Sequence, residues 1–354
     1  MNAALVKIRS RVHTETPTPL LKNPIYIVGA GGIGVALAWS LVRAGCIVTV
    51  VDADPRKVER GRREGLTVVG HGTEQASFTH FNQWAPPAHA LILLCTKTYD
   101  NAAVLAMLPD AAPVVPVQNG FDTELDQRSH AGEGIASFVS ECLRDQPVTR
   151  ITRPGDLHLG PRRSVSAAET SDLAELAQAL AMGALFSVRF VDDVRPYKAT
   201  KLMFNAAISP LAAAAGVDNG ELLTDSLAKR LFFGLLRENY AILRHARLPM
   251  AKIGPFHPNT VSLILRIPGL PSMMGAFFRP SLRGTYCSMT PDIVTERTEI
   301  DAYNGHLIRL AGRLPCPLNR AVFGLVNKIV RERLQPRRGN LDLLEGVLKG
   351  PSLC

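Results

Sequence analysis

The fold is decided by the stretch Ile25-Tyr-Ile-Val28-Gly29-Ala30-Gly31-Gly32-Ile33-Gly34, which is followed by ten residues of helical sequence and Gly45. A short β-branched strand therefore leads into Gly-x-Gly-x-x-Gly and then into a helix that ends at a glycine cap. In this context the first glycine permits a tight turn, the second lets the backbone approach a pyrophosphate, and the third lets helix and strand pack closely. The start of the helix adds amide donors and positive potential. We therefore predict a dinucleotide site, rather than a glycine-rich turn without a ligand, at Gly29, Ala30, Gly31, Gly32, Ile33 and Gly34.

The next predicted strand, residues 47–51, ends at Asp52. A carboxylate about 20 residues after the glycines accepts hydrogen bonds from an adenosine ribose and repels a 2′-phosphate. Asp52 therefore favours NADH over NADPH. Arg56 and Lys57 follow closely and could neutralise a phosphate, so NADPH remains the alternative.

Length and composition describe a globular chain of two domains. Its 354 residues exceed the size at which one hydrophobic core usually stops growing, and 46% of them are hydrophobic while 20% are charged. No apolar run approaches the roughly 20 residues of a membrane-spanning helix. The net charge of +9 does not by itself identify a partner, because a positive surface attracts nucleic acid, phosphate-bearing cofactors and carboxylate substrates alike. The sequence has no basic run with interleaved aromatics, so no nucleic-acid partner is predicted.

The six cysteines show no Cys-x-x-Cys spacing. This pattern argues against a structural zinc site and against a disulfide-stapled domain, so no metal is predicted and a cytoplasmic, reducing environment is expected. Residues 1–23 carry several basic residues without a following apolar segment, and we interpret them as a disordered basic arm.

Short β-branched runs alternate with helical sequences through residues 24–192, as in a parallel sheet with crossover helices. The runs predicted as strands are 25–28, 47–51, 91–95 and 114–117, with 134–139, 149–159 and 187–190 extending the sheet as antiparallel members. Residues 193–335 contain only amphipathic helical stretches, predicted at 198–215, 225–246, 259–265, 292–314 and 320–334. The predicted fold is thus an α/β, Rossmann-type dinucleotide-binding domain, then an all-helical domain and a tail at 336–354.

Polar residues occur where ligands are expected to collect. Lys97 and Asn119 follow two predicted strands at the carboxyl edge of the sheet, although they could be a solvated loop lysine and a turn-former before Gly120. On the first helix of the second half, Lys201, Asn205 and Ser209 form one narrow stripe at about 100° per residue. The other positions of this helix are apolar, so the stripe is expected to line a cleft rather than to face solvent.

These residues together resemble the ketopantoate reductase family over roughly residues 24 to 335. The resemblance rests on the order and spacing of the glycine loop, Lys97, Gln118-Asn119-Gly120, Lys201-x-x-x-Asn205, Ser209-Pro-Leu211, Asn219-Gly-Glu-Leu222, Ser288-Met289, and Thr298-Glu299-Ile-Asp301 followed by Asn304-Gly305. Its specificity comes from the lysine helix combined with the Thr-Glu-Ile-Asp segment about 100 residues later.

The resemblance implies NAD(P)H-dependent reduction of a 2-oxo acid to a 2-hydroxy acid, with ketopantoate as the leading substrate and a homodimer as a possible assembly. Lys201 would donate the proton, and Glu299 would lie where cofactor and substrate meet. Lys97 and Asn119 would lie near the cofactor. The substrate would be held by Asn119, Asn205, Ser209, Asn219 and Ser288. Each of Asn219, Ser288 and Glu299 could instead serve only as a helix cap or first-turn residue.

Two departures from the family leave alternatives open. Ser209 stands where the family usually has an asparagine, and Asp52-Ala53-Asp54 stands where it usually carries a basic residue. Both favour a D-2-hydroxy acid dehydrogenase for branched or aromatic 2-oxo acids. A catalytically silent nucleotide-binding protein is a further alternative. The segment that leads to Ser288 is typical of an ordinary packed helix pair with solvated arginines. The alternative hypothesis is a mobile apolar lid over the cleft at Met273, Met274, Phe277 and Phe278, with Arg279 or Arg283 attracting the substrate carboxylate.

Overall fold

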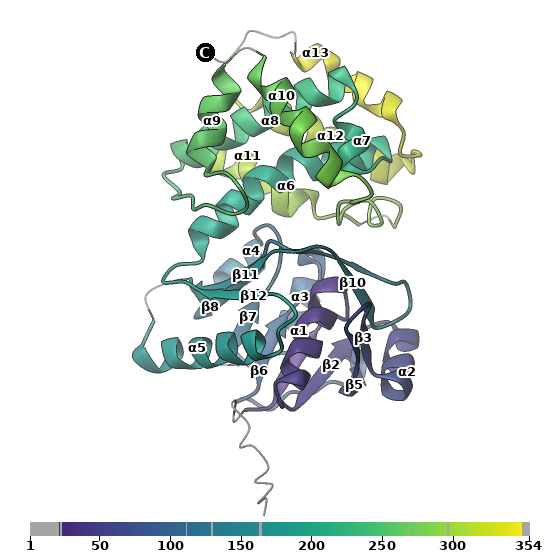
Figure 1. Cartoon of the computed structure of the whole chain (residues 1–354), viewed down its shortest axis with the longest axis vertical. Coiled ribbons are helices and arrows are strands. Elements are labelled where there is room, and N and C mark those ends of the chain that lie inside the picture. Colours follow the sequence, from purple (N-terminus) through teal and green to yellow (C-terminus); the bar gives the residue numbers. More distant parts are fainter. Residues whose placement is uncertain are drawn as a thin grey trace, which may run out of the picture.

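The computed structural model describes residues 21, 23–110, 112–128, 130–162, 165–267, 269–295 and 297–348. Figure 1 shows an α/β lobe and a helical lobe stacked along the long axis, with helix α6 starting at their junction. The predicted α/β half followed by a helical half is confirmed. The basic arm predicted for residues 1–23 lies almost wholly outside the described residues.

A five-stranded parallel sheet with the order β5-β2-β1-β6-β7 forms the centre of the α/β lobe. Its strands are β1 (Ile25–Val28), β2 (Val48–Asp52), β5 (Ser77–His80), β6 (Leu91–Leu94) and β7 (Val114–Pro116). Ile27 pairs with Val50 on one side and Leu93 on the other, and all three are fully buried. Helices α1 (Gly32–Arg43), α2 (Pro55–Glu64), α3 (Asn101–Leu105), α4 (Thr123–Gln127) and α5 (Ala167–Met182) surround the strands of this lobe.

The later strands form two further sheets instead of extending the central one, so that expectation was wrong. One sheet has the order β4-β3-β10-β9 and the other β12-β11-β8, and a single bridge between Val117 and Gly134 joins the latter to β7. Their strands are β3 (Leu66–Val68), β4 (Gly72–Glu74), β8 (Gly132–Ala136), β9 (Val139–Cys142), β10 (Val148–Arg153), β11 (Asp156–Pro161) and β12 (Ser187–Phe190).

The single strand predicted over 149–159 is broken by Pro154-Gly155, so β10 ends at Arg153 and β11 begins at Asp156. The turn packs closely, since a Cβ on Gly155 would lie 2.5 Å from the backbone nitrogen of Phe138. The break lets β10 pair with β9 while β11 pairs with β8.

The helical lobe is built around the long helices α6 (Arg195–Ala215) and α8 (Ser226–His245). The other helices are α7 (Asn219–Leu222), α9 (Pro258–Arg266), α10 (Leu270–Leu282), α11 (His306–Ala311) and α12 (Pro317–Glu332). The helix predicted over 292–314 is wrong in its first part, because residues 292–295 form turns. A π-helical turn, Asp301–Gly305, precedes α11, and its Asn304 donates to the backbone oxygen of Ala206 on α6 at 3.0 Å.

The predicted tail also differs from the structure. Residues Arg338–Leu344 form a 3₁₀ helix and Glu345–Leu348 form α13. Leu341 and Leu344 are buried in the helical core, and Asn340 donates to the backbone oxygen of Ala214 on α6. The short leucine-containing segment after Gln335-Pro336 gave no sustained helical period, which is why the sequence indicated a tail.

Candidate active site

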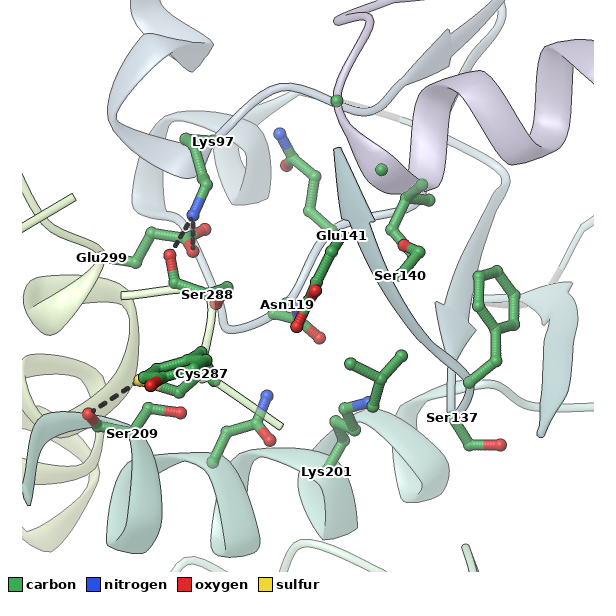
Figure 2. Close-up of a pocket in the computed structure, with 18 of the residues that line it drawn as sticks. Lys97, Asn119, Ser137, Ser140, Glu141, Lys201, Ser209, Cys287, Ser288 and Glu299 are labelled. Atoms are coloured by element: carbon green, nitrogen blue, oxygen red, sulfur yellow. Dashed lines mark hydrogen bonds and ion pairs between the residues drawn. The ribbon is translucent and has the colours of Figure 1, made fainter. Parts of the chain in front are cut away.

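A cavity of about 1360 Å³ lies between the two lobes. Its walls include the glycine loop, the carboxyl ends of β2, β6 and β7, the β9–β10 hairpin and one face of α6. Figure 2 shows Lys97 and Glu299 paired in this pocket and Lys201 projecting from its helix. The polar edge of the sheet and the polar stripe of α6 therefore meet in one space.

The glycine loop has the shape that a dinucleotide requires. Gly29 has φ +102°, and a Cβ on Gly34 would lie 1.9 Å from the backbone oxygen of Gly29. A Cβ on Gly31 would meet nothing within 4 Å, and no side chain caps the first amides of α1. This open, uncapped helix start fits a pyrophosphate.

Four of the six loop residues predicted to bind cofactor line the cavity: Gly29, Gly31, Gly32 and Ile33. Ala30 is buried, and its amide donates to Oδ2 of Asp52 at 2.7 Å. Together with the close approach of Gly34 to Gly29, this contact shapes the loop.

Asp52 lies at the end of β2 and lines the cavity. Its Oδ1 also accepts a hydrogen bond from the amide of Asp54 at 2.8 Å. The nearby basic residues are engaged, because Arg56 forms an ion pair with Asp145 at 2.7 Å and Lys57 donates to the backbone oxygen of Ala30 at 3.2 Å. The position of Asp52 at the cavity wall is the one predicted from the sequence.

Lys97 connects the two lobes. Its Nζ lies 2.5 Å from Oδ2 of Asp292 and 3.2 Å from Oε2 of Glu299, and it donates to the backbone oxygen of Ser288 at 2.9 Å. Burial alone would lower the pKa of Lys97, but the two carboxylates raise it well above its ordinary value. Glu299 is only 4% exposed, so the lysine compensates an acid that is withdrawn from water.

Lys201 is held by the opposite lobe. Its Nζ donates to the backbone oxygen of Ala136, the last residue of β8, at 2.6 Å. Burial, together with a smaller contribution from the neighbouring guanidinium of Arg153, lowers the pKa of Lys201 from 10.5 to about 8. An ammonium with such a pKa can release a proton near neutral pH.

The remaining predicted residues lie in the same cavity: Asn119, Asn205, Ser209, Asn219 and Ser288. Asn219 begins α7 and is buried, and its Oδ1 has no hydrogen-bond partner among the described residues. A buried amide oxygen without a partner is a suitable acceptor for a ligand hydroxyl or amide. The substrate contacts of all five residues remain predictions.

Sequence reasoning missed several charged residues of the cavity region, among them Arg153, Glu141 and Asp292. Arg153 and Glu141 line the cavity from the β9–β10 hairpin, and Asp292 binds Lys97. The turn signal Pro154-Gly155 inside the supposed strand 149–159 could have placed Arg153 at a strand end. Nothing local distinguishes Asp292 or Glu141 from ordinary surface acids.

The predicted lid is not supported at Met273, which is 69% exposed and is absent from the described cavity lining. The side chains of Met274, Phe277 and Phe278 lie outside the described residues. Arg279 and Arg283 are likewise not among the described residues that line the cavity. The apolar wall comes instead from Phe204, Phe232, Phe233, Leu236 and Val261.

Two family models match the chain. "Ketopantoate reductase PanE/ApbA" matches residues 25–163, and "Ketopantoate reductase PanE/ApbA C terminal" matches residues 193–330. A 2-dehydropantoate 2-reductase of Pyrobaculum aerophilum is 24% identical over 307 residues, covering 85% of this chain and 95% of that protein.

Solved structures share the fold. A PanE/ApbA family ketopantoate reductase from Ralstonia eutropha aligns with a TM-score of 0.70 at 22% identity, covering 88% of this chain and 100% of the other. A D-mandelate dehydrogenase solved with NADH and anilino(oxo)acetate aligns with a TM-score of 0.70 at 19% identity, covering 87% and 99%.

Within the described part of the chain, no helix is both long and apolar enough to cross a membrane. Nor do the described residues bring together three or more His, Cys, Asp or Glu side chains that could hold a metal ion.

Proposed function

Because the chain belongs to the ketopantoate reductase family, we propose that it reduces a 2-oxo acid, with ketopantoate as the leading substrate, and that it prefers NADH. It is an NAD(P)-dependent oxidoreductase that acts on CH–OH groups. The observation that carries the proposal is the placement of Lys201, with its lowered pKa, in the same cavity as the open glycine loop.

Lys201 supplies the proton in the proposed reaction. A bound nicotinamide supplies the hydride for the carbonyl carbon, as this cofactor does generally. The ammonium of Lys201 transfers its proton to the carbonyl oxygen, giving the hydroxyl, and the neutral amine regains a proton from solvent. The bond to Ala136 directs the ammonium, since it fixes one of its three donors and leaves two for substrate and water.

The surrounding amides and hydroxyls orient the substrate. Asn205 and Ser209 follow Lys201 on the same face of α6, while Asn119 and Ser288 approach from the sheet edge and from the segment after α10. Orientation of this kind converts binding energy into rate by holding the carbonyl within reach of both hydride and proton. The Lys97–Glu299 ion pair joins the α/β lobe, which carries Asn119, to the helical lobe, which carries the other three residues.

A second candidate substrate class is supported by the helical wall of the cavity. Phe204, Phe232, Phe233 and Leu236 present apolar surface beside the polar stripe of α6. Such a wall favours 2-oxo acids with branched or aromatic side chains over hydroxylated ketopantoate.

The proposed NADH preference rests on Asp52. Its carboxylate lines the cavity at the end of β2, where an acidic side chain favours a ribose hydroxyl and disfavours a 2′-phosphate. Arg56 is ion-paired with Asp145 and is thereby less available to neutralise such a phosphate.

The test is a substrate panel with NADH and NADPH, comprising ketopantoate, 2-oxoisovalerate and phenylglyoxylate. Turnover of ketopantoate with the highest kcat/KM supports the leading substrate, and a preference for phenylglyoxylate selects the second class. Failure to oxidise either nicotinamide with any of these acids would overturn the proposal.

A further inference from the structure

Arg153 is a cation of the cavity that the family resemblance and the reaction above leave unassigned. It is the last residue of β10, and the pairing with β9 is irregular between Ile151 and Arg153. The tightly packed Pro154-Gly155 turn follows at once, and both residues line the cavity beside it. The backbone that carries Arg153 is thus fixed at the pocket wall.

No described residue forms an ion pair or hydrogen bond with the guanidinium of Arg153, although acids lie close by. Asp156 is paired with Arg189 at 2.6 Å. Glu141 lines the same cavity, but its Oε1 is buried without a partner. By contrast, Arg162 is compensated by Asp126 and by Glu133, the latter at 2.9 Å.

Half-buried Arg153 therefore lacks the counter-charge that a buried cation normally has. Burial lowers its pKa, and the guanidinium is near enough to lower the pKa of Lys201 as well. Arg153 and Lys201 therefore both line the cavity, and no carboxylate of the described residues is bound to either. This arrangement is suited to an anionic ligand that reaches both.

We propose that Arg153 binds the carboxylate of the 2-oxo acid substrate and thereby places the adjacent carbonyl beside Lys201. This inference rests on the proposed function and specifies how its substrate class is recognised. The planar guanidinium can donate two parallel hydrogen bonds to the two carboxylate oxygens, which fixes direction as well as position. In a 2-oxo acid the carboxylate is bonded to the carbonyl carbon, so anchoring the carboxylate also orients the carbonyl. The anion anchor comes from the α/β lobe, and neither Arg279 nor Arg283 is needed for it.

The test compares Arg153→Gln and Arg153→Lys with Arg150→Gln, a control on the same strand whose side chain is exposed. For each variant kcat/KM is measured with the preferred 2-oxo acid and with the corresponding uncharged 2-oxo amide. Arg153→Gln is expected to lower kcat/KM for the acid by about 100-fold, the scale of losing a buried charged hydrogen-bond partner, and for the amide by less than about threefold. Arg153→Lys should lose less activity toward the acid than Arg153→Gln, because it keeps the positive charge but cannot donate the two parallel hydrogen bonds of a guanidinium. Arg150→Gln should match the wild type.

The selective loss for the acid distinguishes carboxylate binding from a structural role. Equal losses for acid and amide, or an unchanged preference for the acid, would overturn the assignment. Calorimetric titration of the NADH-loaded protein with oxamate, an unreactive carboxylate analogue, gives a readout that does not depend on turnover. Binding that the wild type shows and Arg153→Gln loses supports the anchor even if no 2-oxo acid is reduced, a result that would defeat only the proposed function. Equal binding by both proteins, or none by either, counts against Arg153.

Discussion

The ammonium of Lys201 on α6 donates a hydrogen bond to the backbone oxygen of Ala136 on β8 at 2.6 Å. The side chain proposed to donate the proton is thus oriented by the backbone of the other lobe. Its position depends on how the lobes are packed and not only on the helix that carries it.

Replacing Lys201 by alanine is expected to lower kcat by about 100- to 10,000-fold, because a general acid used in the transition state is removed. NADH binding, followed by fluorescence, should stay nearly unchanged. Lys328→Ala, at an exposed position on α12, is the control and should retain full activity. A Lys201→Ala variant with near wild-type kcat would rule out the assignment.

The pH dependence of reduction should follow the protonation of Lys201. Its pKa is lowered to about 8 by burial and by Arg153, and the protonated form is the active one. We therefore expect kcat/KM to be level below that pH and to fall above it. In Arg153→Gln one cause of the lowering is gone, so the inflection should move to higher pH. A profile that rises with pH through this range would indicate a base rather than an acid.

Lys97 and Asp292 are expected to act together across the lobes. Asp292→Asn weakens the hold on Lys97, which also binds Glu299 and the backbone of Ser288. The displacement should lower kcat/KM by about tenfold or more, since misplaced groups lose much of their catalytic advantage. Lys97→Met should have a similar effect, and the double variant should be little worse than either single one. Additive losses would show that the two residues act independently. Glu299→Gln should also be damaging.

Cofactor preference should depend on Asp52. Asp52→Ala is expected to weaken NADH use more than NADPH use and so to narrow the gap between them. Arg56→Ala is the matched control, because its guanidinium is held by Asp54 and Asp145, and its effect on NADPH use should stay within about twofold for an exposed pair. Tighter binding of NADPH than NADH by the wild type would contradict the prediction and point to Arg56 and Lys57.

Local patterns predicted a large part of this molecule. The glycine loop needs only a strand, three glycines and a helix in succession, and the stripe of Lys201, Asn205 and Ser209 needs only helical periodicity. Local patterns could not predict contacts between residues that are far apart in the sequence. Asp292 meets Lys97 across 195 positions of sequence, and Arg153 reaches the cavity because the consecutive strands β10 and β11 pair in separate sheets. Burial of Leu341 and Leu344 likewise depends on a core already formed by other helices.

The packing of residues 338–348 against α6 has a consequence for synthesis of the chain. Asn340 donates a hydrogen bond to a backbone carbonyl of α6, the helix that carries Lys201. Leu341 and Leu344 are buried in the core of the helical lobe. The α/β lobe can fold as soon as it leaves the ribosome, since its strands all lie within the first part of the sequence. The helical lobe can complete its core only after residue 348 has emerged. Until then the nascent chain holds a folded nucleotide-binding lobe joined to a helical partner with exposed apolar surface, a state in which chaperones would recognise it.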